Sequence, residues 1–164
     1  MDTSLTDKLL EVLNKESAIY EGILKLSKEK TDAIVAGKVS ELERITKLEQ
    51  SIILKLGKLE RERESIVESI AAGLGKKAAE ITLTDIISVM PGAEAKKLKE
   101  YQEGFAKLLE KLRGANMLNS KLIRNSLEYI DFSINILAGA GAEGNYSNIG
   151  GSEVLKKNFF DMKL

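Results

Sequence analysis

The sequence contains no cysteine and no histidine, and it has a single proline in 164 residues. Without cysteine there is neither a disulfide framework nor thiolate chemistry, which fits a reducing compartment. Without histidine the chain lacks the commonest general base and the commonest transition-metal ligand. A ferritin-like di-metal bundle, which takes Glu-x-x-His from two of its helices, is therefore excluded. We expect no enzymatic activity, no metal and no cofactor.

The chain also lacks an excess of either charge, because 25 basic residues balance 25 acidic ones. Nucleic-acid binders and polybasic membrane binders rely on an excess of positive charge. Zero net charge without a local Lys/Arg run therefore argues against both kinds of binding. No charged leader precedes an apolar stretch at the start, and no apolar run approaches the roughly 18 residues of a membrane span. The alternating Glu-Arg run at 60–64 is typical of a solvated helix surface. We expect a cytoplasmic protein without membrane insertion.

What is present is helical periodicity, and no period-two alternation indicates a strand. Capping patterns at Ser4-x-x-Asp7 and Ser40-x-x-Glu43, with Gly37 between them, predict two long helices. Thr82 and Asp85 open a short helix that ends before Pro91. A last long helix is expected over about 93–138, weakened at Gly104 and Gly114 by up to about 1 kcal/mol each. The fold class is therefore all-α.

The second helix carries the three-and-four spacing of a coiled-coil seam. Its seam residues are Leu42, Ile45, Glu49, Ile52, Leu56, Leu59, Arg63, Ile66 and Ile70. Because short links make neighbouring helices antiparallel, we predict an elongated antiparallel helical hairpin, completed to a three-long-helix coiled-coil bundle with one short connecting helix. Residues 1–138 would form this bundle domain, and 139–164 a flexible Gly/Ala-rich tether with a short amphipathic C-terminal tail.

Polar residues occupy several seam positions. Glu49 and Arg63 are expected to fix register, either by contacting each other across a crossing or by lying at a solvated edge. Asn116 and Asn119 in the last helix have two interpretations, which are register fixing and hydrogen bonding to an incoming peptide backbone.

The stretch 118–137 has more apolar surface than one helix contact needs. On a helical wheel that turns roughly 100° per residue, the apolar side chains of the preceding stretch cover an arc of about 100°. In the stretch 118–137 this arc widens to about 220°. Such a surface must be covered by the chain's own helices, by a second copy or by a client. The first or the short third helix is one possible cover, and a structural homodimeric coiled coil is the alternative function. For a client we predict a surface that comprises Leu118, Asn119, Leu122, Tyr129, Phe132 and Ile136.

Taken together, these features resemble the FlgN family of flagellar export chaperones, which serve hook-filament junction proteins. The resemblance rests on the order and spacing of the seam residues, the segment at 82–86 after a glycine break, Asn116-x-x-Asn119-x-x-Leu122-Ile123, and Tyr146 with Gly150. It implies a non-enzymatic cytoplasmic chaperone that holds the C-terminal helical segments of junction proteins and presents them to the export gate of flagellar type III secretion. It also implies client binding at 119–137 and gate docking at Tyr146 and Gly150. The chain departs from the family pattern in its extra Gly/Ala-rich stretch and in its ending at 154–164.

Overall fold

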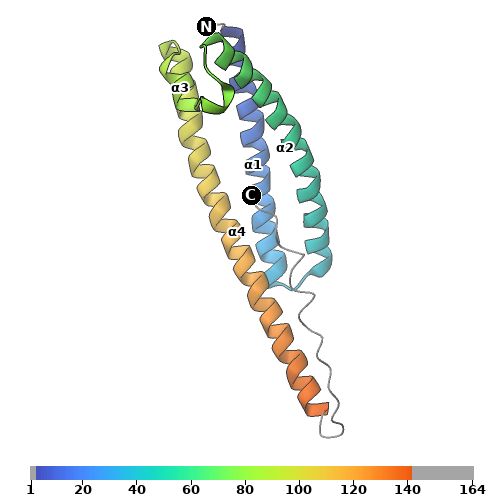
Figure 1. The fold of residues 1–164 in the computed structure, drawn as a ribbon. Coiled ribbons are helices and arrows are strands. Elements are labelled where there is room, and N and C mark those ends of the chain that lie inside the picture. Colours follow the sequence, from blue (N-terminus) through green and yellow to red (C-terminus); the bar gives the residue numbers. More distant parts are fainter. Residues whose placement is uncertain (1–2, 142–164) are drawn as a thin grey trace. The chain divides into compact units, whose positions relative to one another are not determined.

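Residues 3–141 are described by a computed structural model, and they contain five helical segments and no strand (Figure 1). The predicted all-α class is therefore confirmed. The segments in chain order are α1 (Thr3–Val35), α2 (Val39–Gly73), the 3-10 turn η1 (Ala78–Glu80), α3 (Leu83–Ser88) and α4 (Gly92–Gly141). The chain divides into two compact units, Met1–Asn125 and Ser126–Leu164. The tether and tail predicted after residue 138 lie almost entirely outside the described residues.

The helices α1 and α2 form the predicted hairpin. Gly37 adopts a φ of +65° in the link, a left-handed conformation that glycine reaches without steric cost. Ion pairs join the two helices in antiparallel order, because Lys30 near the link contacts Glu49 while Arg63 contacts Glu16. The predicted capping box at Ser40 is wrong: the N-cap of α2 is Lys38, two residues earlier, and it makes no side-chain hydrogen bond.

The short helix α3 begins with the predicted capping box. The Asp85 backbone N–H donates to Thr82 Oγ1 at 3.2 Å, and the Thr82 backbone N–H donates to Asp85 Oδ2 at 2.8 Å. Hydrogen bonds from Thr82 also hold the pKa of the Asp85 carboxyl below its usual value. With its first turn fixed in this way, six residues suffice to place Ile86 in the core.

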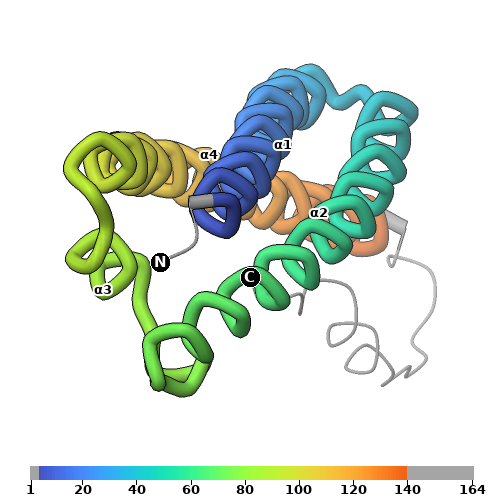
Figure 2. The backbone as a smooth tube through the Cα atoms, turned by 90° about the horizontal axis from the view of Figure 1, so that it is seen from above, coloured from blue at the N-terminus to red at the C-terminus, as the bar shows by residue number. Residues whose placement is uncertain are grey.

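The first part of α4 runs parallel to α1. Tyr20 packs edge-on against Phe105 with ring centroids 5.2 Å apart, and further along both helices Ser27 bonds Asn116. Seen from above, α2 and the first part of α4 lie on opposite sides of α1, and α3 connects them (Figure 2). The helix α4 continues through Gly104 and Gly114, so the cost of these glycines is offset by its packing.

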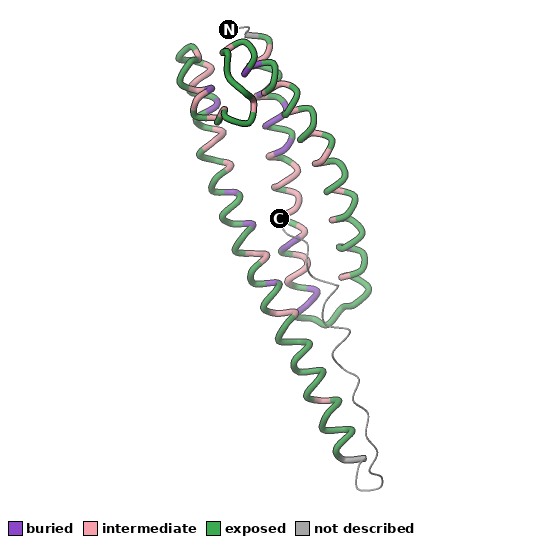
Figure 3. Tube along the Cα trace, viewed as in Figure 1, coloured by how far each residue is buried: buried purple, intermediate pink, exposed green. Residues whose placement is uncertain are grey.

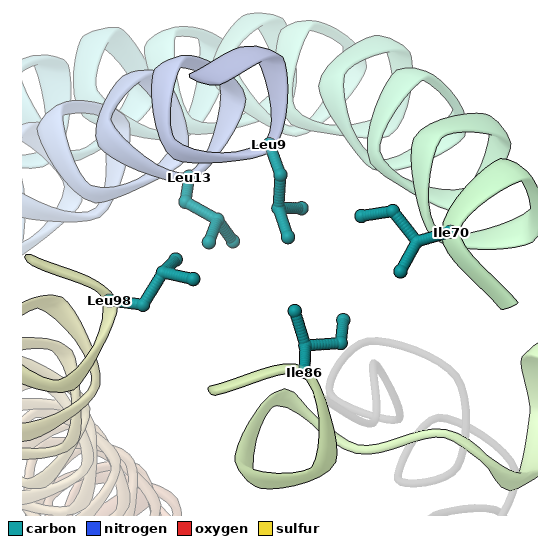
Figure 4. Close-up of a cluster of buried hydrophobic side chains, with 5 residues drawn as sticks. All are labelled: Leu9, Leu13, Ile70, Ile86 and Leu98. Atoms are coloured by element: carbon teal, nitrogen blue, oxygen red, sulfur yellow. The ribbon is translucent and has the colours of Figure 1, made fainter. Parts of the chain in front are cut away.

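The core lies where all four helices meet. Five side chains point toward one another there and are at most 6% exposed (Figure 4). They are Leu9 and Leu13 from α1, Ile70 from α2, Ile86 from α3 and Leu98 from α4. Each buried side chain of this size contributes roughly 1.5–3 kcal/mol of transfer free energy. The cluster therefore ties the short connection and the start of α4 to the hairpin.

Candidate functional site

The end of α4 exposes a continuous series of large apolar side chains. Seven of them between 127 and 137 are each 50% to 73% exposed, and Figure 3 shows this segment almost wholly in the exposed class. They are Leu127, Tyr129, Ile130, Phe132, Ile134, Ile136 and Leu137. On a helical wheel they belong to both stripes of the predicted arc. We call this set the apolar face of α4.

Three predicted site residues belong to the unit Met1–Asn125 and differ in exposure. Leu118 is exposed, Leu122 is half-buried, and Asn119 is only 4% exposed. The predicted residues Tyr129, Phe132 and Ile136 all belong to the apolar face. Tyr146 and Gly150, predicted to dock at the export gate, lie outside the described residues.

The asparagines at 116 and 119 bind α1. Ser27 Oγ donates to Asn116 Oδ1 at 3.0 Å, and Thr31 Oγ1 donates to Asn119 Oδ1 at 2.6 Å. Asn119 Nδ2 completes the contact by donating to the Ser27 carbonyl at 2.8 Å. In this structure both amides thus fix the position of α4 on α1, as the register interpretation expected. Their partners were missed, although Ser27 and Thr31 continue the apolar stripe of Leu9, Leu13 and Tyr20 at helical spacing.

Glu49 and Arg63 do not contact each other, contrary to one of the two expectations. Glu49 accepts a bond from Lys30 at 2.9 Å, and Arg63 Nε donates to Glu16 Oε1 at 3.1 Å. Arg63 lies at a solvated edge, with 37% of its side chain exposed, whereas the Glu16 side chain is almost fully buried. Desolvation raises the pKa of Glu16, and the charge of Arg63 opposes this rise only in part.

A polar group without a partner lies close to this ion pair. The Tyr101 hydroxyl is buried and has no hydrogen-bond partner within residues 3–141. Desolvation, followed by the nearby charge of Glu16, raises the pKa of Tyr101 well above its ordinary value. The ring stacks on Phe105 with centroids 5.4 Å apart. Sequence periodicity placed Tyr101 and Phe105 on the core stripe, and it gave no sign that the hydroxyl would stay unpaired.

The described residues offer no group of acidic side chains suited to holding a metal ion. Within the same part of the chain, none of the helices combines the length and the apolarity needed to cross a bilayer. What the apolar face of α4 does offer is a large apolar area on one helix. This arrangement is suited to binding another polypeptide through side-chain burial.

The fold and this surface define an all-helical protein that presents an apolar helix face. The model of the family described as "FlgN protein" matches residues 1–153. The chain belongs to the FlgN family, and this membership supports a role as a flagellar export chaperone in general.

A relative in Bacillus subtilis (strain 168) supports this membership. The chain is 30% identical over 158 residues to a protein described as "Uncharacterized protein YvyG", and the match covers 94% of this chain and 96% of the relative. No solved structure matches the chain.

Proposed function

We propose that this chain is a non-enzymatic chaperone that binds the C-terminal helical segments of hook-filament junction proteins in the cytoplasm, prevents their premature association and delivers them to the export gate. The observation that carries the proposal is the apolar face of α4, with seven large side chains at least half exposed. Membership of the FlgN family supports the choice of client class. Chaperones of this kind act by burial and need no catalytic group.

The spacing on the apolar face suits an amphipathic client helix. Tyr129, Phe132 and Ile136 follow one another at intervals of three and four residues, which is the spacing of anchor side chains in helix-in-groove recognition. Each side chain that becomes buried contributes roughly 1.5–3 kcal/mol of transfer free energy. Several such anchors suffice for micromolar affinity after the costs of association and ordering are subtracted.

The remaining predicted residues have distinct roles in this proposal. Leu118 and Leu122 are proposed as client contacts of the unit Met1–Asn125, where Leu118 is the more exposed of the two. Asn119 acts as a positioning residue, because its side chain is bonded to Ser27 and Thr31 of α1. Tyr146 and Gly150 are assigned to docking at the export gate on the family resemblance alone.

The test is a binding titration with the C-terminal segment of a junction protein. Phe132→Asp together with Ile136→Asp is expected to weaken binding at least about 100-fold, because two buried anchors are lost and two charges would have to be desolvated. Both side chains are more than half exposed, so the free protein should keep its helicity by circular dichroism. A charge-matched control, Arg124→Gln with Asn135→Asp, alters the polar side of the same helix and is expected to bind normally.

Unchanged binding by the Phe132→Asp, Ile136→Asp variant would contradict the proposed surface. The alternative, a structural homodimer, is distinguished by sedimentation at micromolar concentration. A permanent dimer that the same two substitutions convert to a monomer would assign the apolar face to self-association instead of a client.

A further inference from the structure

A cavity of about 570 Å³ lies within the unit Met1–Asn125, and none of its lining residues belongs to the apolar face of α4. Its walls come from α1, α2, the η1–α3 connection and the first part of α4. The lining includes the large apolar side chains Leu13, Tyr20, Leu56, Val67 and Phe105. A volume of this size is in the range of sites that take up a ligand or several side chains of a partner.

The cavity borders the α2 seam at two of its positions, Leu56 and Arg63. Ile45 and Ile70 are 1% and 2% exposed, so the seam is closed at both ends. The seam residues between them are only half-buried; they include Ile52, Leu56, Leu59 and Ile66. A coiled-coil seam normally inserts each of its positions into a partner helix. Of these half-buried seam residues Leu56 lines the cavity, so the seam leaves apolar surface incompletely covered at this point of the cavity wall.

A buried polar atom in the cavity wall also lacks a partner. Tyr101 lines the cavity, and its hydroxyl has no hydrogen-bond partner among the described residues. Leaving a buried hydroxyl unpaired destabilises the folded protein, so such groups normally have a partner or a function.

The charge around the cavity is strongly acidic although the whole chain is neutral. Four carboxylates line it, Glu16, Glu60, Glu64 and Glu68, against the single guanidinium of Arg63. Glu60, Glu64 and Glu68 are exposed and form the rim on α2, whereas the buried Glu16 is paired with Arg63. An acidic rim around an apolar interior selects a partner with an apolar face flanked by lysine or arginine.

We propose that this cavity, with its acidic rim on α2, is a second docking site, and that its occupant is a basic amphipathic helix of another protein. The inference does not rest on the client-binding proposal, because the two sites share no residue. The chain's own segment 152–164 complements the rim less well, since it carries three lysines and two acidic residues.

The test uses a helical probe peptide of about 18 residues, built from leucine and lysine at helical spacing, with one photo-reactive benzoylphenylalanine on its apolar side. Binding to the full chain is followed by fluorescence anisotropy. Glu64→Lys with Glu68→Lys is expected to weaken binding about tenfold at low salt, with a smaller loss at high salt. The matched control is Glu103→Lys with Glu110→Lys, which makes the same charge change on exposed positions outside the cavity lining and should leave binding unchanged. A peptide with glutamate in place of lysine should bind at least tenfold more weakly.

Photo-crosslinks in the segments 52–68 and 101–105 would support the site. Crosslinks confined to 127–137, or an equal loss of binding in the two double variants, would overturn it. Stronger probe binding after Phe159→Asp with Phe160→Asp would show that the chain's own tail is the occupant, which also overturns the proposal. A dimer of the chain that Glu64→Lys with Glu68→Lys dissociates would overturn it as well, because a second copy would then occupy the cavity.

Discussion

At the scale of single residues, the structure is most informative where a polar group is buried. Two such groups lie close together in the bundle: the Tyr101 hydroxyl, which has no partner among residues 3–141, and the Glu16 carboxylate, which pairs with the more exposed guanidinium of Arg63. A buried polar group weakens folding unless its hydrogen bonds and charge are compensated. Each of these residues therefore has a measurable consequence for stability.

Removing the Tyr101 hydroxyl should stabilise the free protein. Tyr101→Phe keeps the ring contact with Phe105 and deletes an unsatisfied buried group, so the free energy of unfolding is expected to rise by about 1 kcal/mol. Urea denaturation followed by circular dichroism measures this difference. Tyr20→Phe is the matched control, because Tyr20 also contacts Phe105 and should give no comparable gain. A loss of stability in Tyr101→Phe would show that the hydroxyl is bonded in solution.

The Glu16 carboxyl should make stability depend on pH. Its pKa in the folded protein is raised, chiefly by desolvation, so its contribution is most favourable below the unfolded pKa of about 4.3 and is lost as the pH rises through the folded value. Glu16→Gln keeps an acceptor for Arg63 without the buried charge. We expect this variant to be more stable than the parent at pH 7, with a difference that shrinks toward pH 4. Equal pH profiles, or a difference that grows toward pH 4, would contradict the assignment, and Glu64→Gln on the exposed surface serves as the control.

At the scale of elements, the sequence predicted the features that depend on a few neighbouring residues. The capping box at Thr82 and the turn at Gly37 depend on a few neighbouring residues, and both are present as expected. The N-terminus of α2 was misplaced by two residues, because the helix begins after Lys38, which makes no side-chain capping bond that the sequence could signal. Which polar seam residues would meet could not be predicted, since pairs such as Lys30–Glu49 depend on the relative register of two helices.

The polar contact between α1 and α4 should be needed for their docking. Asn119→Ala removes an acceptor for Thr31 and a donor to Ser27 at a buried position, and the expected cost is about 1–3 kcal/mol of unfolding free energy. Denaturant unfolding measures it, with Asn125→Ala at an exposed position of the same helix as the control. A change as small as that of the control would mean that water replaces these bonds without cost.

At the scale of the whole molecule, the chain distributes its apolar surface unevenly. The excess of apolar residues at 118–137 was readable from helical periodicity alone, and the structure leaves most of this surface exposed. The cavity in the unit Met1–Asn125 was not readable, because it depends on how far the helices separate. Periodicity shows which side of a helix is apolar, whereas the distance between helices depends on all their side chains together.

This uneven distribution should appear in amide hydrogen exchange. In the free protein, amides at 127–139 have little side-chain packing around them, so they should exchange faster than those at 98–119, where Leu98, Leu108 and Leu112 are buried. A helix without tertiary packing gains little stability from propensity alone. Adding the C-terminal segment of a junction protein should slow exchange at 127–139 by at least about tenfold and leave 98–119 unchanged, because only the first segment gains packing. If 127–139 were already as protected as 98–119 in the free monomer, the apolar face would be covered without a client, and the proposed binding surface would have to lie elsewhere.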